Sequence, residues 1–349
     1  MRYIPIIALT ALAACTAADV QSPEPLEREA ASVWAWGDHF ADLQERSCPT
    51  GETYTRAQSI EVQVIEAEQG SAQARSQNLS GLTLAGAWQL KSDEPNFGGL
   101  SGMDVLRSGS LLTVSDAGAF VWIGIDPDTG TPDGIGSIAY LRGEDGNFFP
   151  TKIAADAEGL SLRDGLAMVS FEQDHRIEAF NLERCGSAAR GARVVSFDGV
   201  VDGRRIGDNR GAEGLMVSGE TLVAGFETHH SGGSPRVEIM DDGSLTLQDY
   251  TEQPGLYVLT GMDQADGLTA TLFRAYDPVR GARVILQVDR ADGRAAEAHF
   301  KKPLPVDNFE GVAFGTSPDG KPRIWIISDD NFSRDQRTLL LALDLDEMP

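Results

Sequence analysis

Three glutamates of this chain each stand directly before a glycine at the start of an apolar run. They are Glu158 in DAEGLSL, Glu213 in GAEGLMV and Glu310 in DNFEGVAF. Carboxylates that converge on one opening offer the oxygen ligands that hard divalent cations such as calcium prefer. They can also carry a proton as a general acid or base. Since the three glutamates lie far apart in the chain, either chemistry depends on a fold that brings them together.

A repeat built around the glycine indicates that fold. Gly102, Gly159, Gly214, Gly261 and Gly311 recur at intervals of roughly fifty residues, and a second and a third apolar run follow each of them. A unit of about fifty residues with three or four strands matches the blade of a β-propeller. The strands in IEVQVIEA and LTLAGAWQL precede the first marked glycine and are material for one more blade. The sequence therefore predicts an all-β, six-bladed propeller whose closure is shared between N-terminal and C-terminal strands.

The propeller gives the glycine and its neighbour a physical meaning. Innermost strands crowd around a central channel, where a residue without a Cβ allows close backbone approach. The residue before the glycine is then drawn toward the channel mouth. The second run of each repeat ends in another set of polar residues, which symmetry should place on a common ring: Asp116, Glu172, Glu227, Arg274, Asp329 and Asp330.

Several motifs together resemble a known family. FGGLSGMDV, DAEGLSL, VSFEQDHRI, NRGAEGL, DNFEGVAF and ISDDNFSRDQRTLLLALDL, which fall within residues 97 to 345, are similar to the "esterase-like activity of phytase" family of exported bacterial proteins. The resemblance implies a propeller related to the alkaline phytases, which bind several calcium ions and use them to hydrolyse phosphate esters. The fourth repeat departs from the acidic pattern, because it carries Thr260 before its glycine and Arg274 at the end of its second run.

These residues predict divalent-cation-dependent hydrolysis of a phosphorylated or other anionic ester at the central funnel. The expected ligands of calcium, or of another divalent cation, are Asp116, Glu158, Glu172, Glu213, Glu227, Glu310, Asp329 and Asp330. The expected contacts to a small anionic substrate come from Arg176, Arg210, Arg274 and Asn331, because guanidinium groups bind phosphate and carboxylate. Proton transfer falls to His175 or to one of the glutamates Glu158, Glu213 and Glu310.

Plainer interpretations of the same residues remain open. The carboxylates and arginines could neutralise one another as structural salt bridges between blades, since ion-pair networks resemble functional sites. His175 could simply cap a turn. The whole funnel could belong to a noncatalytic propeller that binds an envelope polymer or a protein. Ser101 in GLSGM lacks the full G-x-S-x-G pattern, which disfavours a serine esterase.

The N-terminal segment predicts export. Residues 1–14 have the layout of a signal peptide, and Leu12 to Cys15 resembles the cleavage box of bacterial lipoproteins, with Cys15 as the lipidated residue. An ordinary cleaved signal is the alternative. Residues 15–33 are then a tether, residues 34–57 an N-terminal extension, and residues 58–349 the propeller. We expect a lipid-anchored monomer at the periplasmic face of the bacterial envelope.

Charge and cysteine content narrow the range of partners. The formal net charge is −24, which argues against binding to nucleic acid because phosphate backbones need clustered Lys and Arg. No Cys-x-x-Cys or Cys/His cluster occurs, which disfavours a thiolate zinc site. Cys48 and Cys185 are free to pair in an oxidising compartment, although the sequence does not show that they lie close together.

Overall fold

A computed structural model describes residues 37–197, 200–201, 203–207, 210–218, 221–227, 233–240 and 242–346. The predicted signal peptide, the predicted lipidation site Cys15 and the predicted tether lie outside these residues. Within the described part of the chain, no helix is long and apolar enough to cross a membrane.

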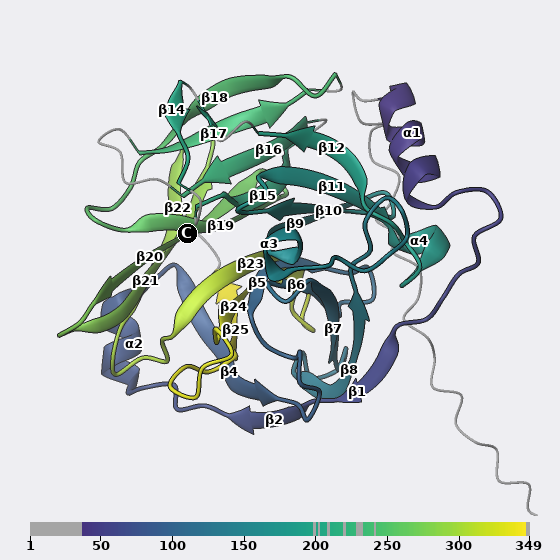
Figure 1. Ribbon diagram of the computed structural model, residues 1–349. Helices are drawn as coiled ribbons and strands as arrows, with labels where there is room; N and C mark the ends of the chain where they lie inside the picture. Colours follow the sequence, from purple (N-terminus) through teal and green to yellow (C-terminus); the bar gives the residue numbers. More distant parts are fainter. Residues whose placement is uncertain are drawn as a thin grey trace, which may run out of the picture.

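Five antiparallel sheets surround a common centre and form the blades of a β-propeller (Figure 1). Blade 1 contains β1 (Gln58–Glu61), β8 (Pro132–Tyr140), β7 (Ala119–Ile125), β6 (Leu111–Ser115) and β5 (Leu100–Val105), in this order from the rim to the channel. Blade 2 contains β12 (Ala192–Ser196), β11 (Arg176–Asn181), β10 (Leu166–Phe171) and β9 (Ala157–Arg163). Blade 3 runs from the channel outward through β15 (Ala212–Ser218), β16 (Thr221–Phe226), β17 (Ser234–Ile239) and β18 (Leu245–Thr251).

The last two blades combine C-terminal strands with strands that precede blade 1 in the sequence. Blade 4 contains β19 (Val258–Ala265), β20 (Leu268–Asp277), β21 (Gly281–Arg290), β22 (Gly293–Phe300) and the short β3 (Leu79–Ser80). Blade 5 contains β23 (Asn308–Thr316), β24 (Pro322–Asp329), β25 (Leu339–Leu345), β4 (Leu82–Lys91) and β2 (Gln63–Glu66). A small hairpin of β13 (Val200–Val201) and β14 (Arg204–Arg205) lies apart from these sheets.

The prediction of six blades is wrong, because the N-terminal strands do not build a blade of their own. The fifth marked repeat supplies only three strands, and β4 adds the fourth by pairing along β25, with Leu341 opposite Ala87. β1 extends the rim of blade 1 through β8. The innermost strands β23 and β5 contact each other directly, so the ring closes with five. The two chain ends do share a blade, as the sequence predicted, and β25 lies between the C-terminal β24 and the N-terminal β4.

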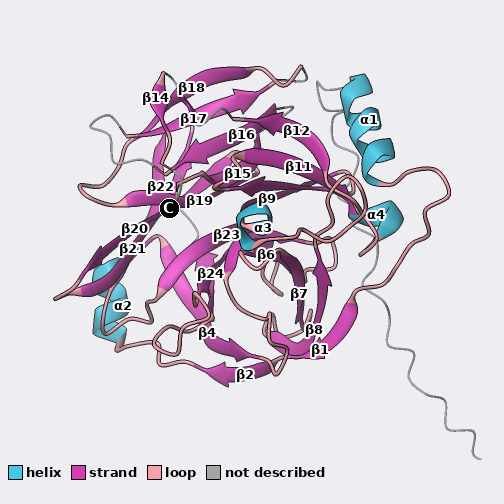
Figure 2. Cartoon of the chain, in the orientation of Figure 1, coloured by secondary structure: helices cyan, strands magenta, loops and turns pink. Residues whose placement is uncertain are grey.

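The hydrophobic core is divided among the five junctions between neighbouring blades. One apolar cluster fills each junction, and the largest joins blades 4 and 5 through residues such as Leu286 and Leu341. Each blade therefore buries both faces, which explains why its strands read as continuous Val, Ile and Leu runs in place of a strict alternation. The described helices are short; α1 (Gly37–Ser47), α2 (Ala72–Asn78) and α4 (Leu182–Cys185) lie at the outside of the strands, and α3 (Lys152–Ala155) lies over the centre of the propeller in this view (Figure 2).

The marked glycines lie where the innermost strands crowd together, as the sequence predicted. A Cβ on Gly102 would stand 2.5 Å from the backbone oxygen of Glu158 in the next blade, and one on Gly311 would stand 2.7 Å from the backbone oxygen of Ser101. Van der Waals radii forbid both contacts, so only glycine allows the inner strands to approach this closely.

A disulfide ties the N-terminal extension to blade 2. Cys48 follows α1 (Gly37–Ser47) and bonds to Cys185 in α4 (Leu182–Cys185), with the two Cα atoms 5.8 Å apart. The helix α1 packs on β11 and β12 at the outside of the propeller. The possible pairing of the two thiols is thus realised, and it links segments that are 137 residues apart in the sequence.

Candidate functional site: an acidic ring at the channel mouth

A β-bulge in every innermost strand directs one residue into the channel mouth. In blade 5, Phe309 pairs with Ser328 and Gly311 pairs with Ile327, so Glu310 is the extra residue between two pairs. The registers of the other innermost strands shift at the same place. A bulge leaves its extra residue outside the ladder and re-aims its side chain. The extra residues of blades 1 to 5 are Ser101, Glu158, Glu213, Thr260 and Glu310.

A second residue of each blade stands beside the bulge, at the end of the neighbouring strand. The backbone amide of Asp116 bonds to Gly99 at 2.9 Å, and that of Glu172 bonds to Asp156 at 3.0 Å. The corresponding residues of blades 3 to 5 are Glu227, Arg274 and Asp329, which pair with Gly211, Val258 and Asn308. Five of the six residues predicted from the second runs, all except Asp330, therefore occupy equivalent positions next to the bulges.

The repeats fall into two kinds. Blades 2, 3 and 5 carry a glutamate on the bulge. Blades 1 and 4 carry Ser101 or Thr260 there, and two residues past the glycine they place an aspartate that holds the next blade. Asp104 accepts a hydrogen bond from Leu162 N at 2.7 Å, and Asp263 accepts one from Phe314 N at 2.7 Å. The motifs LSGMDV and LTGMDQ thus provide hydrogen bonds between neighbouring blades, whereas the Glu-Gly motifs provide the carboxylates of the channel mouth.

Arg274 neutralises one half of the ring. Its guanidinium donates to Glu310 Oε1 at 2.6 Å and to the side-chain oxygen of Asn308, and it lies 4.0 Å from Glu227. Asn308 in turn donates to Glu310 at 2.9 Å and approaches Asp329 at 3.5 Å. The carboxylates of this half therefore have protein partners.

The other half has fewer partners for its charge. Lys152, the first residue of α3 (Lys152–Ala155), contacts Asp116 at 2.7 Å and Asp156 at 3.5 Å. Oδ1 of Asp116 is buried and accepts no hydrogen bond from any residue that the structure describes, and the buried Oδ1 of Asp156 has only the 3.5 Å contact to Lys152. One carboxylate oxygen from each of Asp156, Glu158 and Glu172 lies within 4.8 Å of the other two. Calcium binds oxygen at about 2.4 Å, which places two of its ligands at most about 4.8 Å apart.

Burial and the charges of neighbouring carboxylates raise the pKa values of several ring residues. Burial and the charge of Asp156 raise the pKa of Glu172 to about 7, and burial and the charge of Glu310 raise the pKa of Asp329 to about 8. Burial, followed by the charges of other ring glutamates, raises the pKa values of Glu158 and Glu213 well above the usual range. Burial also raises the pKa of Glu310, and the attraction of Arg274 offsets only part of that shift. Upward pKa shifts of this kind are expected for buried carboxylates that lack sufficient compensating positive charge.

The remaining residues that the sequence proposed occupy several places. His175 is buried in the turn between β10 and β11, at the same end of blade 2 as Glu172. Arg176 is buried, with only 1% of its side chain exposed, and donates to Glu178 at 2.8 Å and to the carbonyl of Ala154 at 2.6 Å. Its guanidinium is therefore bound by protein groups.

Two further predicted residues stand close to the ring. Arg210 precedes β15, next to Gly211, whose amide donates to Glu213 at 2.9 Å. The backbone amide of Asn331 donates to the ring residue Asp329 at 2.6 Å. Asp330 turns away to bind Gly99 N at 3.0 Å and Thr338 at 3.0 Å, so it supports the loop beside the ring.

Three residues of the site were not predicted. Asp156 and Asn308 stand three residues before Gly159 and Gly311, and the same alignment that found the glutamates would have found them. Lys152 carries no such signal, because it comes from the connection between β8 and β9 and not from the repeated strands.

The fold and the ring together define a β-propeller with an acidic channel mouth. The chain belongs to the Phytase-like family, described as "Esterase-like activity of phytase", whose model matches residues 95–272 and 259–332. These ranges contain the five marked glycines and the ring. A comparison with curated protein sequences finds no significant match.

The similarity to solved structures is distant. A putative gluconolactonase has 12% sequence identity and a TM-score of 0.42, over 89% of this chain and 97% of that chain. A thermostable family-43 glycoside hydrolase has 12% identity and a TM-score of 0.41, over 72% and 96%. An endo-arabinase from Bacteroides thetaiotaomicron has 10% identity and a TM-score of 0.43, over 73% and 96%.

Proposed function

We propose that this protein is a divalent-cation-dependent hydrolase that acts on a phosphorylated or other anionic ester at the channel mouth. The observation that carries the proposal is the trio Asp156, Glu158 and Glu172, whose oxygens converge while the nearest cation, Lys152, contacts only one of the three. A buried cluster of this kind needs a compensating cation or protons. The buried Oδ1 of Asp116, which accepts no hydrogen bond from any described residue, fits a compensating cation.

The donor set matches calcium. Asp156, Glu158 and Glu172 would hold the ion, with Asp116 beside them, because calcium takes carboxylate oxygens in flexible geometry. A bound cation of this type polarises an ester oxygen and lowers the pKa of a coordinated water.

The chain's own residues supply binding and proton transfer. Arg274 is fixed by Glu310 and Asn308, while its second terminal nitrogen stands 4.0 Å from Glu227 and can turn toward an anionic group of the substrate. Glu213 accepts a hydrogen bond from Gly211 N, and burial with the charges of neighbouring glutamates raises its pKa, which suits it to carry a proton. The sequence-based role of His175 in proton transfer remains part of the proposal.

Hydrolysis by the metal-stripped protein, with and without added calcium, tests the proposal. We expect calcium to restore turnover of a phosphomonoester, and Glu158→Gln to lower kcat by about a hundredfold or more. The matched control is Glu238→Gln on β17, outside the ring, which should keep wild-type kcat. Equal turnover without any divalent cation, or full activity of Glu158→Gln, would contradict the proposal. Absence of turnover on phosphate and carboxylate esters alike would favour a noncatalytic binding propeller.

We also propose that a lipid on Cys15 holds the protein at the periplasmic face of the envelope, on the strength of the Leu-Ala-Ala-Cys sequence. In cells, Cys15→Ser should abolish incorporation of labelled fatty acid and release the protein from the membrane fraction. Labelling that persists in this variant would refute the anchor.

A further inference from the structure

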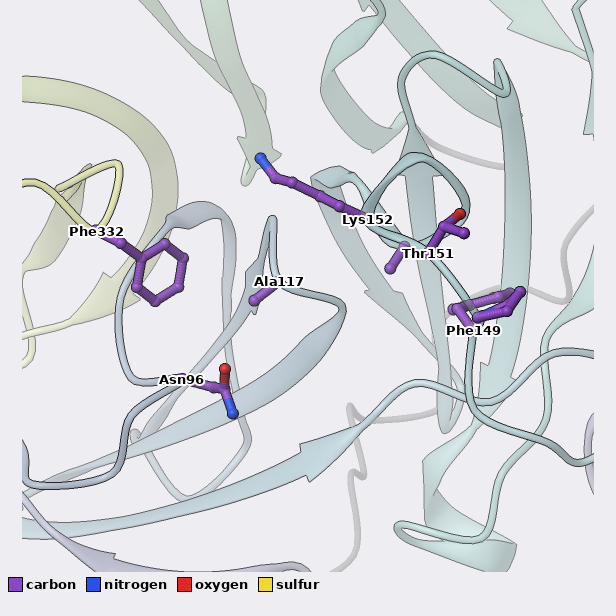
Figure 3. A pocket seen from close by; sticks show the side chains of 8 residues that line it. Asn96, Ala117, Phe149, Thr151, Lys152 and Phe332 are labelled. Atoms are coloured by element: carbon purple, nitrogen blue, oxygen red, sulfur yellow. The ribbon is translucent and has the colours of Figure 1, made fainter.

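A cavity of about 440 Å³ opens beside the acidic ring and is not part of it (Figure 3). The walls include Asn96, Ala117, Phe149, Thr151, Lys152 and Phe332. Its volume falls within the range of about 300–1,000 Å³ that is typical of small-molecule sites. In the close-up, Phe332 and Phe149 stand on opposite sides, and Lys152 extends between them.

Phe332 is held in an exposed position by the loop that also carries ring residues. The side chain is 45% exposed, although burial would favour so large an apolar ring. Asn331 and Phe332 both adopt left-handed backbone conformations, with φ of 48° and 47°. Such conformations cost of order 1–3 kcal/mol each and persist at sites where the surroundings impose them. Here Asp329 accepts from Asn331 N at 2.6 Å and Asp330 accepts from Phe332 N at 3.0 Å.

Two glycines let the aromatic ring of Phe332 lie against the backbone. A Cβ on Gly98 would stand 3.1 Å from Phe332 Cε1, and one on Gly99 would stand 2.8 Å from Cε2. Gly99 also leaves room for the carboxylate of Asp116. The phrase FGGL therefore shapes the cavity wall and the adjacent edge of the ring at the same time.

The opposite wall is rigid. Phe149 makes an edge-on contact with Phe171, with ring centroids 5.6 Å apart, and the guanidinium of Arg176 lies 5.1 Å from its ring centre. Arg176 is itself fixed by Glu178. The cavity thus has one anchored aromatic side chain and one on a strained loop in its lining, and aromatic side chains bind flat apolar groups.

Lys152 lies at the boundary between the cavity and the acidic ring. It lines the cavity, and its ammonium group contacts Asp116 and Asp156 of the site. Within the described part of the chain, Lys152 and Arg274 are the two cations in recorded contact with ring carboxylates. Arg210 stands nearby, and the net charge of the chain is −24, so the protein's own residues supply too few positive groups at the mouth to pair with a ligand that carries many phosphates. A ligand with a single anionic group would be tolerated.

From these observations we infer the substrate class: an ester with one phosphate or other anionic group, attached to a flat apolar ring that binds between Phe332 and Phe149. The inference rests on the proposed function, and it disfavours inositol polyphosphates as ligands. The anionic group would lie at the ring of carboxylates and their cation, and the flat group would fill the cavity.

Binding of two nonhydrolysable probes tests this inference without relying on turnover. The full chain with calcium is titrated calorimetrically with benzylphosphonate and with methylphosphonate, which share the anionic group and differ in the aromatic ring. We expect benzylphosphonate to bind at least about fivefold more tightly. Phe332→Ala should remove that preference while leaving the affinity for methylphosphonate unchanged.

Phe148→Ala is the matched control, because Phe148 is an exposed neighbour that makes an edge-on contact with Tyr140, has Arg142 over its ring and is not among the residues that line the cavity. It should retain the wild-type preference, and unchanged melting temperatures would show that both variants fold. If the wild type binds the two phosphonates equally, or Phe332→Ala keeps the preference, the inference is overturned and the proposed function stands. If neither phosphonate binds, both fall together.

Discussion

The two halves of the acidic ring are built from the same repeat, yet they handle their charge differently. On the Arg274 side, Glu310 and Asp329 have a guanidinium and the amide of Asn308 as partners. On the Asp156 side, three carboxylates converge and Lys152 contacts only one of them. The arginine stands where the other blades place a carboxylate. The arginine in place of a carboxylate thus partly neutralises one half of the ring, and the other half has still less compensating charge.

This difference shows that structural and functional interpretations of an acidic cluster need not exclude each other. The Arg274 side corresponds to salt bridges that join blades, and the Asp156 side corresponds to a metal site. Substitutions and pH changes that act on one half of the ring should distinguish the salt bridges from the metal site. We expect the largest effect on the Arg274 side.

Substitution of Arg274 should cause the largest loss of unfolding free energy. Arg274→Met leaves Glu310 without its guanidinium, and loss of one partner from a buried pair costs about 4 kcal/mol of unfolding free energy. Chemical denaturation at pH 8 measures the loss. Arg294→Met, which breaks exposed contacts to Asp289 and Glu297, should cost less than about 1 kcal/mol. Equal losses in the two variants would show that the Arg274 side is not a buried network.

Rising pH should destabilise the protein when divalent cations are absent. The pKa of Glu172 is raised to about 7 and that of Asp329 to about 8, so the folded state retains protons that the unfolded chain releases. Stability from these groups is full below their unfolded pKa values near 4 and is lost as pH rises through 7 and 8. Denaturation in EDTA should show a loss of about 3 kcal/mol between pH 5 and pH 8. A flat profile would refute the crowding of unpaired carboxylates.

Substitutions on the two sides should have opposite signs at pH 8 without metal. Asn308→Ala leaves buried polar groups of the Arg274 side unsatisfied and should cost about 2 kcal/mol. Glu158→Gln removes one of several mutually repelling charges and should stabilise the metal-free protein by about 1 kcal/mol. Thermal melts in EDTA provide the measurement. Destabilisation by Glu158→Gln would place Glu158 among the structural residues instead.

The smallest effect is expected at Lys152, which competes with a cation for Asp116 and Asp156. Its side chain is 62% exposed, so Lys152→Met should change the unfolding free energy by only about 0.5 kcal/mol. Removal of this positive charge should nevertheless tighten calcium binding about fivefold. Lys321→Met, at an exposed pair with Asp319, is the control and should leave calcium affinity unchanged. Weaker binding by Lys152→Met would mean that Lys152 supports the site.

Much of the fold could be predicted because the repeat is written in local sequence. Gly102 and Gly311 mark innermost strands, because neighbouring inner strands can approach this closely only where a residue has no Cβ. The number of blades was not visible, because it depends on β4 pairing with β25 across more than two hundred residues, as in the pair Ala87 and Leu341. Such a distant pairing leaves no local pattern.

The ring was predicted for the same reason, since its residues recur at fixed offsets from the glycines. Lys152 and the exposed position of Phe332 could not be predicted, because they belong to loops that differ from blade to blade. The partition of the ring into two halves also escaped prediction. It depends on the side-chain geometry around Arg274 and Asn308, which the sequence positions alone do not specify.

The most direct test of the account is the position of calcium in crystals grown at pH 8 with the ion present, located by its anomalous scattering at long wavelength. The account predicts a peak bounded by Asp156, Glu158 and Glu172, on the side opposite Arg274. An ion-free site there at saturating calcium, or a peak confined to the Arg274 side, would contradict it.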